Sequence, residues 1–176
     1  MRVSAPVLVR EATAADAAQI GDVHAESWRV AHRNLFEDRS LAVFAERRRA
    51  RWMAGLAELA AAGTDTVLLA QRGDRTIAFA WYGPHRVKPH DAELHAFYAH
   101  PHVWGTGVAQ TLLDEVFTGL GDYRRVRLWT LSGATRARRF YTRAGFTESG
   151  LIRERDYGDG RPVLEVEYAR RPPVTR

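Results

Sequence analysis

The alternation of apolar and polar residues is clearest between Asp91 and Phe117, where it predicts a strand, a turn and a helix in direct succession. The strand, Glu93–Ala99, mixes both kinds of residue and stops before Pro101, which cannot donate a hydrogen bond to a sheet. After the turn, apolar residues recur at the spacing of one buried helical face. They are Val108, Ala109, Leu112, Leu113, Val116, Phe117 and Leu120.

Similar patterns divide the rest of the chain into short strands and helices. Strands are expected at Val7–Arg10, Thr66–Ala70, Thr76–Tyr82 and Arg125–Leu131, with a final pair between Ile152 and Arg170 around Gly158–Gly160. Helices are expected from a capping box at Thr13 and Asp16 to Ala31, at Leu41–Ala62, and at Ala134–Ala144 before a terminating Gly145. The charged run Glu46–Arg49 is interpreted as a solvated face of the second helix, with a position at the fringe of a site as the alternative.

This order of elements predicts an α/β (α+β) fold with a mixed, mostly antiparallel sheet. The helix between Ala99 and Arg125 favours a crossover that joins two parallel neighbouring strands. A length of 176 residues with 45% hydrophobic content suits one domain, expected at residues 1–170, followed by a loose tail at 171–176.

The amino-acid composition excludes several kinds of catalytic and metal site. The chain has no cysteine, which excludes disulfides, thiolate metal sites and cysteine nucleophiles, and no metal is expected. Neither a signal pattern nor a membrane-length apolar run is found, so a cytoplasmic protein without a membrane partner is expected. The net charge of +5 is spread over the helices, and Lys88 is the only lysine. A nucleic-acid partner is not expected, because no recognised module accompanies the charge.

The turn Trp104–Ala109 contains two glycines directly before a helix. Glycines let the main chain approach a ligand, and the amides of a helix N-terminus can hold an anion such as a diphosphate. A tight turn without a ligand is an equally good interpretation of this stretch alone. The dinucleotide fingerprint lacks its third glycine, and the phosphate-binding loop lacks its lysine.

A second motif, Leu128–Phe146, distinguishes these alternatives. Together with the glycine turn, it resembles the GCN5-related N-acetyltransferase (GNAT) family, which shares a Gln/Arg-x-x-Gly-x-Gly/Ala turn and an Asn-x-x-Ala-x-x-Phe-Tyr-x-x-x-Gly-Phe helix. The resemblance covers nearly the whole chain, including Ser27-Trp28-Arg29. It implies the GNAT fold, with a splayed pair of parallel strands and about four flanking helices, and acetyl-coenzyme A as acyl donor.

The resemblance also implies which residues bind the coenzyme. The turn amides would hold its pyrophosphate, and they are those of Gly105, Thr106, Gly107, Val108, Ala109 and Gln110. The main chain of Phe97, Tyr98 and Ala99 would pair with the pantetheine arm, and Arg136 would add a further contact. Two residues depart from the family pattern: Trp104 replaces Gln or Arg, and Ala134 replaces Asn. Weaker or rearranged coenzyme binding is expected from these changes.

The catalytic residues expected are Tyr141 and Glu93. Tyr141 matches the family's general acid, and a phenol suits a thiolate leaving group. Glu93 is expected to be the general base, because the period of two would place Glu93, His95 and Phe97 on one face. The expected contacts to the acceptor are Trp28, Arg29, His32, Tyr82 and Glu93. Alternatively, Tyr141 is an ordinary core tyrosine and Glu93 a surface strand residue.

The sequence thus predicts an N-acetyltransferase that transfers acetyl from acetyl-coenzyme A to a primary amine of a small molecule or peptide by direct attack. The alternative is a catalytically impaired acyl-coenzyme A-binding protein of the same fold. A nucleic-acid-binding module is the third hypothesis. The last strands could also pair across a homodimer axis, although nothing in their pattern requires it.

Overall fold

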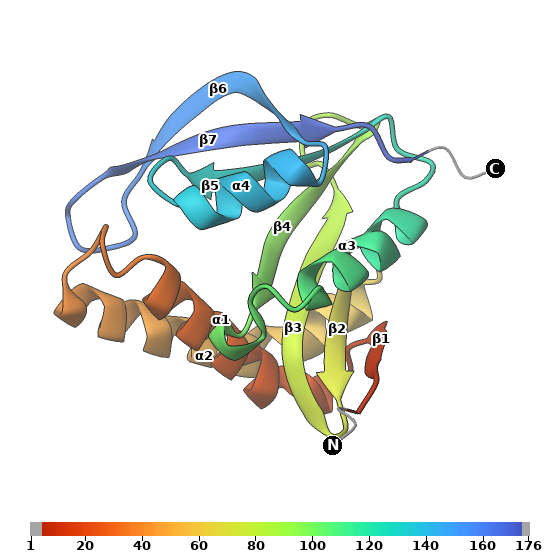
Figure 1. The fold of residues 1–176 in the computed structure, drawn as a ribbon, viewed down its shortest axis with the longest axis horizontal. Helices are drawn as coiled ribbons and strands as arrows, with labels where there is room; N and C mark the ends of the chain where they lie inside the picture. Colours follow the sequence, from red (N-terminus) through yellow and green to blue (C-terminus); the bar gives the residue numbers. More distant parts are fainter. Residues whose placement is uncertain (1–4, 174–176) are drawn as a thin grey trace.

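A seven-stranded mixed sheet forms the centre of the protein, seen here in a computed structural model that describes residues 5–173 (Figure 1). The strand order is β1-β2-β3-β4-β5-β7-β6. The strands are β1 Val7–Glu11, β2 Thr66–Arg72, β3 Arg75–Pro84, β4 Asp91–Ala99, β5 Arg125–Leu131, β6 Thr147–Arg155 and β7 Val163–Arg170. Neighbouring strands are antiparallel except β4 and β5, which confirms the predicted mixed sheet. Residues 1–4 and 174–176 of the expected domain and tail lie outside the described residues.

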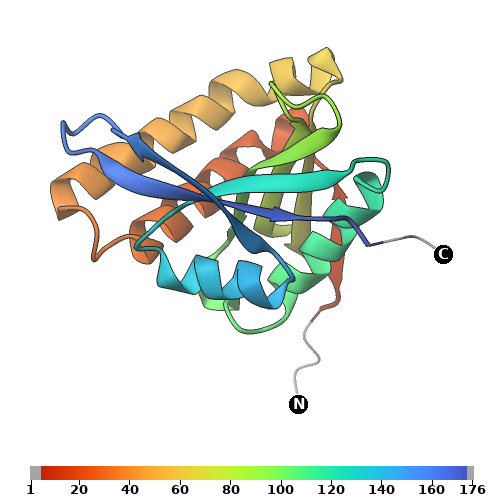
Figure 2. The ribbon, with the colours of Figure 1, turned by 90° about the horizontal axis from the view of Figure 1, so that it is seen from above.

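Four α-helices cover the two faces of this sheet, as Figure 2 shows. Helices α1 and α2 lie on one face, and α3 and α4 lie on the other. Their bounds are α1 Ala17–Ala31, α2 Asp38–Ala62, α3 Val108–Gly119 and α4 Thr135–Arg143, with short 3₁₀ turns at η1 Ala14–Asp16 and η2 Pro101–Val103. None of the helices in residues 5–173 has the length and apolar character that crossing a membrane requires.

Two element boundaries differ from the prediction, each for a local reason. Helix α2 begins at Asp38 rather than Leu41, because Glu37 and Asp38 place negative charge at the positive end of the helix. Strand β6 begins at Thr147 rather than Ile152. An irregularity in its pairing with β7 between Glu148 and Ile152 contains Gly150, at φ +89°, and so gives the sequence the character of a turn.

The parallel strands β4 and β5 pair over only three residues. The register joins Asp91 to Arg125, Ala92 to Val126 and Glu93 to Arg127. Beyond Glu93 the two strands diverge, as the ribbon in Figure 1 shows. Among the described residues, no strand therefore pairs with the β5-facing edge of β4 from Leu94 to Ala99. This is the splayed pair that the family resemblance implies.

A buried group of three charged side chains lies where β4 and β5 are still paired. Nε of Arg127 donates to Asp91 at 2.5 Å, and Nη1 donates to Glu167 at 2.6 Å. The three side chains come from β5, β4 and β7, so the triad joins three adjacent strands. Only 1% of Glu167 is exposed, which leaves its charge little access to water. Both carboxylates therefore depend on Arg127 for compensation.

His24 of α1 and His32, the C-cap residue of this helix, are neutral groups. Nδ1 of His32 lies 2.9 Å from the carbonyl oxygen of Trp28, and burial lowers the pKa of His32 from 6.5 to about 4. Burial also lowers the pKa of His24 well below its usual value, and the positive charge of Arg48 acts in the same direction. Neither imidazole is expected to be protonated at neutral pH.

Replacing Arg127 by Met should lower the free energy of unfolding by about 3–5 kcal/mol, because two buried carboxylates lose their partner. Urea denaturation measures the change. The control is Arg125→Met, an exposed position on the same strand, for which a change within about 0.5 kcal/mol is expected. Equal effects of the two substitutions would contradict the role given to the triad.

The free energy of unfolding should also fall as the pH is lowered from 6.5 to about 4. In this range the unfolded chain binds protons at His32 that the folded chain excludes, so protonation favours unfolding. The pKa shift of His32 corresponds to about 3 kcal/mol. Thermal or urea denaturation across this range should show a shallower pH dependence for His32→Gln. Identical slopes for the two proteins would show that His32 titrates normally in the folded state.

Candidate active site

The turn between β4 and α3 presents an open main-chain surface. Gly105 and Gly107 have φ values of +78° and +87°, which L side chains rarely adopt. A Cβ atom at either position would meet no other atom within 4 Å, so the glycines leave the outer side of the turn free. The amides of Val108, Ala109 and Gln110 lie in the first turn of α3 and have no acceptor within the helix. The arrangement fits an anionic ligand.

Trp104 holds this turn against the end of β4. Its indole Nε1 donates to the carbonyl oxygen of Ala99 at 2.7 Å. The guanidinium of Arg136, in the first turn of α4, lies over the indole at 4.3 Å from the ring centroid. Trp104 replaces a polar side chain of the family motif, and in this chain it positions a guanidinium beside the glycine turn. Ala134, the other departure, is buried and donates its amide to the carbonyl oxygen of Leu131 at 2.9 Å.

A β-bulge at His95 overturns the expected shared face of Glu93, His95 and Phe97. Trp81 of β3 pairs with Ala96 and Tyr82 pairs with Leu94, so His95 is an extra residue. The alternation shifts there by one residue. Phe97 therefore stacks on Phe140 of α4, with ring centroids 5.6 Å apart, whereas His95 packs on Trp81, at 4.9 Å.

Glu93 and His95 are close to each other on the opposite face, that of α1 and α2. Nδ1 of His95 lies 3.7 Å from a carboxylate oxygen of Glu93, and Nε2 of His85 lies 4.0 Å from the other oxygen. The contact with His95 holds the pKa of Glu93 below its usual value. Glu93 is therefore ionised at neutral pH.

Asp65 extends this polar group beyond what the sequence indicated. Its Oδ2 accepts hydrogen bonds from Trp81 at 2.9 Å and Arg86 at 3.1 Å, and lies 3.7 Å from Nε2 of His95. Gly83 makes room for it, because a Cβ there would lie 2.2 Å from Oδ1. Asp65 precedes β2 and approaches His95, and His85 follows β3 and approaches Glu93, in both cases only through tertiary packing. No local sequence pattern predicts such contacts.

Tyr141 lies on the α3 and α4 face, in the same cluster as Phe97. Its ring centroid is 6.5 Å from that of Phe97, 5.8 Å from Phe146 and 6.2 Å from Tyr168. Burial raises the pKa of the Tyr141 phenol, and the neighbouring Tyr98 acts in the same direction. The hydroxyl group therefore keeps its proton at neutral pH.

Besides Glu93, the sequence suggests four residues for the acceptor pocket, and only two of them, Trp28 and His32, lie together. Trp28 and His32 are in contact, with ring centroids 4.4 Å apart, and only 1% of Trp28 is exposed. Arg29 points outward to Glu26, with a 2.9 Å ion pair. Tyr82 lies apart from these residues: it packs beneath α3 at Gly119, because alternate residues of β3 face opposite sides of the sheet and Trp81 takes the α1 and α2 side.

The expected solvated face at Glu46–Arg49 is wrong for Arg48. This side chain turns inward, and its guanidinium lies 3.8 Å from the ring centroid of Trp28 and 5.8 Å from that of Tyr157. The sequence indicates this position only through helical periodicity. Phe44 and Trp52, both buried, are four residues before and after Arg48, so the three side chains lie on one face of the helix.

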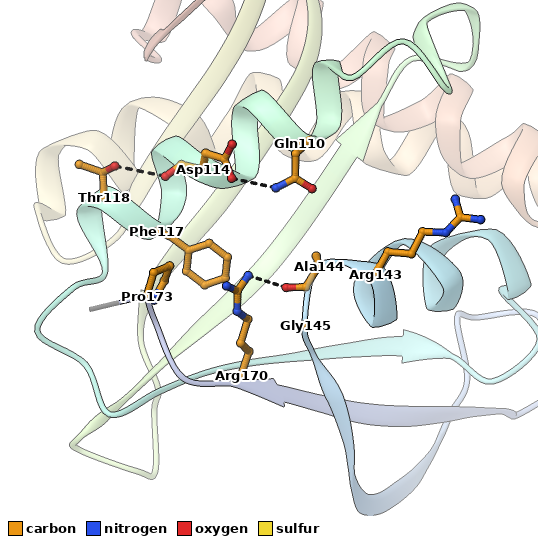
Figure 3. A pocket seen from close by; sticks show the side chains of 9 residues that line it. All are labelled: Gln110, Asp114, Phe117, Thr118, Arg143, Ala144, Gly145, Arg170 and Pro173. Atoms are coloured by element: carbon orange, nitrogen blue, oxygen red, sulfur yellow. Dashed lines mark hydrogen bonds between the residues drawn. The ribbon is translucent and has the colours of Figure 1, made fainter. Parts of the chain in front are cut away.

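An open groove of about 560 Å³ separates α3 from the end of α4 and from β7 (Figure 3). Gln110, in the first turn of α3, is at one end, and its side chain donates to Asp114 at 2.8 Å. Arg170 lies over the ring of Phe117 and donates to the carbonyl oxygen of Ala144. The lining residues are Gln110, Asp114, Phe117, Thr118, Arg143, Ala144, Gly145, Arg170 and Pro173. In the described part of the chain, no three histidine, aspartate or glutamate side chains are grouped to hold a metal.

Solved structures share this fold at low sequence identity. PaiA N-acetyltransferase from Thermoplasma acidophilum, in complex with coenzyme A, is 17% identical, with a TM-score of 0.73 over 92% of this chain and 98% of that one. A ribosomal-protein-alanine N-acetyltransferase from Brucella melitensis is 23% identical, with a TM-score of 0.69 over 93% and 99%. The acetyltransferase yncA from Salmonella typhimurium, with its cofactor acetyl-CoA, is 19% identical, with a TM-score of 0.66 over 95% and 94%.

Sequence comparison identifies the family. No curated protein sequence matches the chain. The model of the acetyltransferase (GNAT) family matches residues 23–146, which include the diverging strands, the glycine turn and helix α4. The chain therefore belongs to the acetyltransferase (GNAT) family.

Proposed function

We propose that the protein is an N-acetyltransferase that transfers acetyl from acetyl-coenzyme A to a primary amine of a small molecule or peptide. The observation that carries this proposal is the unpaired edge of β4 leading directly into the open glycine turn. Two structures of the same fold contain coenzyme A or acetyl-CoA, which supports this choice of donor. No metal is required for the reaction.

The main chain around the turn suits the two halves of the coenzyme. The free edge at Phe97, Tyr98 and Ala99 can pair with the amides of the pantetheine arm as an added strand would. The amides of Gly105 and from Gly107 to Gln110 are suited to the pyrophosphate, whereas the amide of Thr106, also expected there, donates to the carbonyl oxygen of Val103 at 3.3 Å. Their function does not depend on the side chain at position 104, so the Trp104 departure leaves this cradle intact.

Arg136 provides the side-chain charge that Trp104 cannot. The indole supports the guanidinium from one side at 4.3 Å, which limits its freedom and keeps it beside the turn. An ordered guanidinium is well suited to a phosphate group. We therefore assign Arg136 to the coenzyme pyrophosphate, in the role that Gln or Arg has in the family motif. Ala134 contributes only apolar surface to the coenzyme wall.

Bound acetyl-coenzyme A supplies an activated acyl group as a thioester. The amine nitrogen forms a bond to the carbonyl carbon, the carbon–sulfur bond breaks, and sulfur takes up the electron pair. Tyr141 donates its phenolic proton to this sulfur, and burial ensures that the proton is present beforehand. An acceptor that arrives as an ammonium ion first releases one proton to the solvent and attacks as the neutral amine. Glu93, which is ionised at neutral pH, then takes the second proton from the nitrogen through a water molecule as the bond forms.

Tyr141→Phe should lower kcat at least about 100-fold and leave the Kd for acetyl-coenzyme A within about twofold, because only the proton donor is lost. Free-thiol release across a panel of amines gives kcat, and calorimetry gives Kd. Tyr168→Phe is the matched control, since it lies in the same buried cluster and should retain turnover.

Arg136→Ala should give the opposite result in these two assays: an approximately tenfold higher Kd with kcat at saturation nearly unchanged. Arg39→Ala, exposed on α2, controls for the loss of charge. Unchanged turnover in Tyr141→Phe would refute the acid role. Binding of acetyl-coenzyme A without thiol release on any amine would favour the acyl-coenzyme A-binding alternative, and absence of binding would exclude both.

A further inference from the structure

Arg48 is a half-buried cation without a carboxylate partner. Its Nε donates to Nε2 of His24 at 3.2 Å, and Nη1 donates to the carbonyl oxygen of Phe44 at 3.0 Å. Among the described residues, no carboxylate lies within 4.0 Å of its guanidinium. Nη2 and the second proton of Nη1 are therefore left without an acceptor in the protein.

The next residue of the helix, Arg49, differs from Arg48 in that carboxylates neutralise its charge. It pairs with Asp22 at 2.8 Å, Glu26 at 3.5 Å and Glu46 at 2.5 Å. Three carboxylates of α1 and α2 thus neutralise one guanidinium, while the guanidinium beside it has none. The difference indicates that the charge of Arg48 is kept for a ligand.

The surroundings of Arg48 add to its positive charge. Burial lowers the pKa of Arg48, and the charges of Arg155 and Arg51 act in the same direction, while Tyr98 and Tyr157 oppose them. The buried carboxylate of Glu165, which accepts from the hydroxyl of Tyr157 at 2.5 Å, is already bound by Arg153 at 2.5 Å. A half-buried charge without compensation is costly, and an incoming anion would remove that cost.

Arg48 is also placed where an acceptor would reach the diverging strands. Its guanidinium lies on Trp28, and Trp28 belongs to an apolar cluster with Leu131 and Ala134 at the end of β5. Tyr98, at the end of β4, packs against the same cluster. On the α1 and α2 face, the cluster therefore contacts both β4 and β5 at the ends where the two strands are apart. This is also the face on which Glu93 lies.

We infer that Arg48 binds a carboxylate of the acceptor, so that the acceptor is an amine that also carries a carboxylate, such as an amino acid. This inference rests on the proposed acetyltransferase function. The free Nη1 and Nη2 protons form a fork that matches the two oxygens of a carboxylate. The rings of Trp28 and Tyr157 exclude water on either side and strengthen the ion pair.

Free-thiol release with acetyl-coenzyme A tests this on pairs of acceptors that differ only in the carboxylate: tyrosine and tyramine, tryptophan and tryptamine, histidine and histamine. The carboxylated member should have at least a tenfold higher kcat/KM in the reactive pairs. Arg48→Gln should raise KM for that member at least tenfold and leave KM for the other within about twofold. Arg48→Lys should restore part of the difference and guards against a folding defect. Arg39→Gln, on the same helix, should change neither.

If none of these amines reacts, a binding measurement tests the same contact between Arg48 and a carboxylate. The Nε–H resonance of Arg48, identified by its loss in Arg48→Gln, should shift when a mixture of N-acetyl amino acids is added to the coenzyme A-loaded protein. The matched N-acetyl amines should leave it unchanged. Equal efficiency within each pair, or no shift with the carboxylates, would overturn the inference while leaving acetyl transfer intact. Failure to bind acetyl-coenzyme A would instead remove the proposed function, and this inference with it.

Discussion

The short parallel pairing of β4 and β5 is the constraint on which the rest of the site depends. Three residues of each strand are paired, and the buried triad of Arg127 with Asp91 and Glu167 fixes this end. Because the strands are joined there and diverge afterwards, the main chain of β4 keeps an unpaired edge inside the molecule. The glycine turn follows directly after this edge, so the anion cradle and the free strand edge have one orientation relative to each other.

The bulge at His95 then divides the chemistry between the two faces of the sheet. Phe97 and Tyr141 lie on the face of α3 and α4, together with the turn and the groove. Glu93 and His95 lie on the face of α1 and α2, as do Trp28 and Arg48. In the proposed reaction, the donor and the acid therefore approach from one face, and the acceptor and the base from the other. Direct attack through the splay requires such an arrangement.

The sequence predicts the parts of this structure that depend on local patterns. Helical periodicity from Val108 to Leu120, the two glycines before it and the hairpin at Gly73 all specify backbone geometry within a few residues. The family motifs add the splayed strands. The bulge could not be predicted in this way, because an extra residue in β4 is defined only by its register with β3.

Contacts between distant residues were also beyond the sequence. His85 reaches Glu93 and Asp65 reaches His95, and Arg48 leaves a charged run to pack on an aromatic ring of another helix. The roles of Tyr141 and Glu93 remain predictions from the family motif and the placement of the side chains. What the structure adds is their environment: a buried phenol on one side of the splay and an ionised carboxylate on the other.

Amide hydrogen exchange with and without acetyl-coenzyme A tests the central claim most directly, because the proposed contacts are to main-chain amides. Slower exchange is expected from Phe97 to Gln110, with no change in the hairpin at Arg72–Arg75. Tight binding of acetyl-coenzyme A that leaves the amides from Phe97 to Gln110 unprotected would contradict the account.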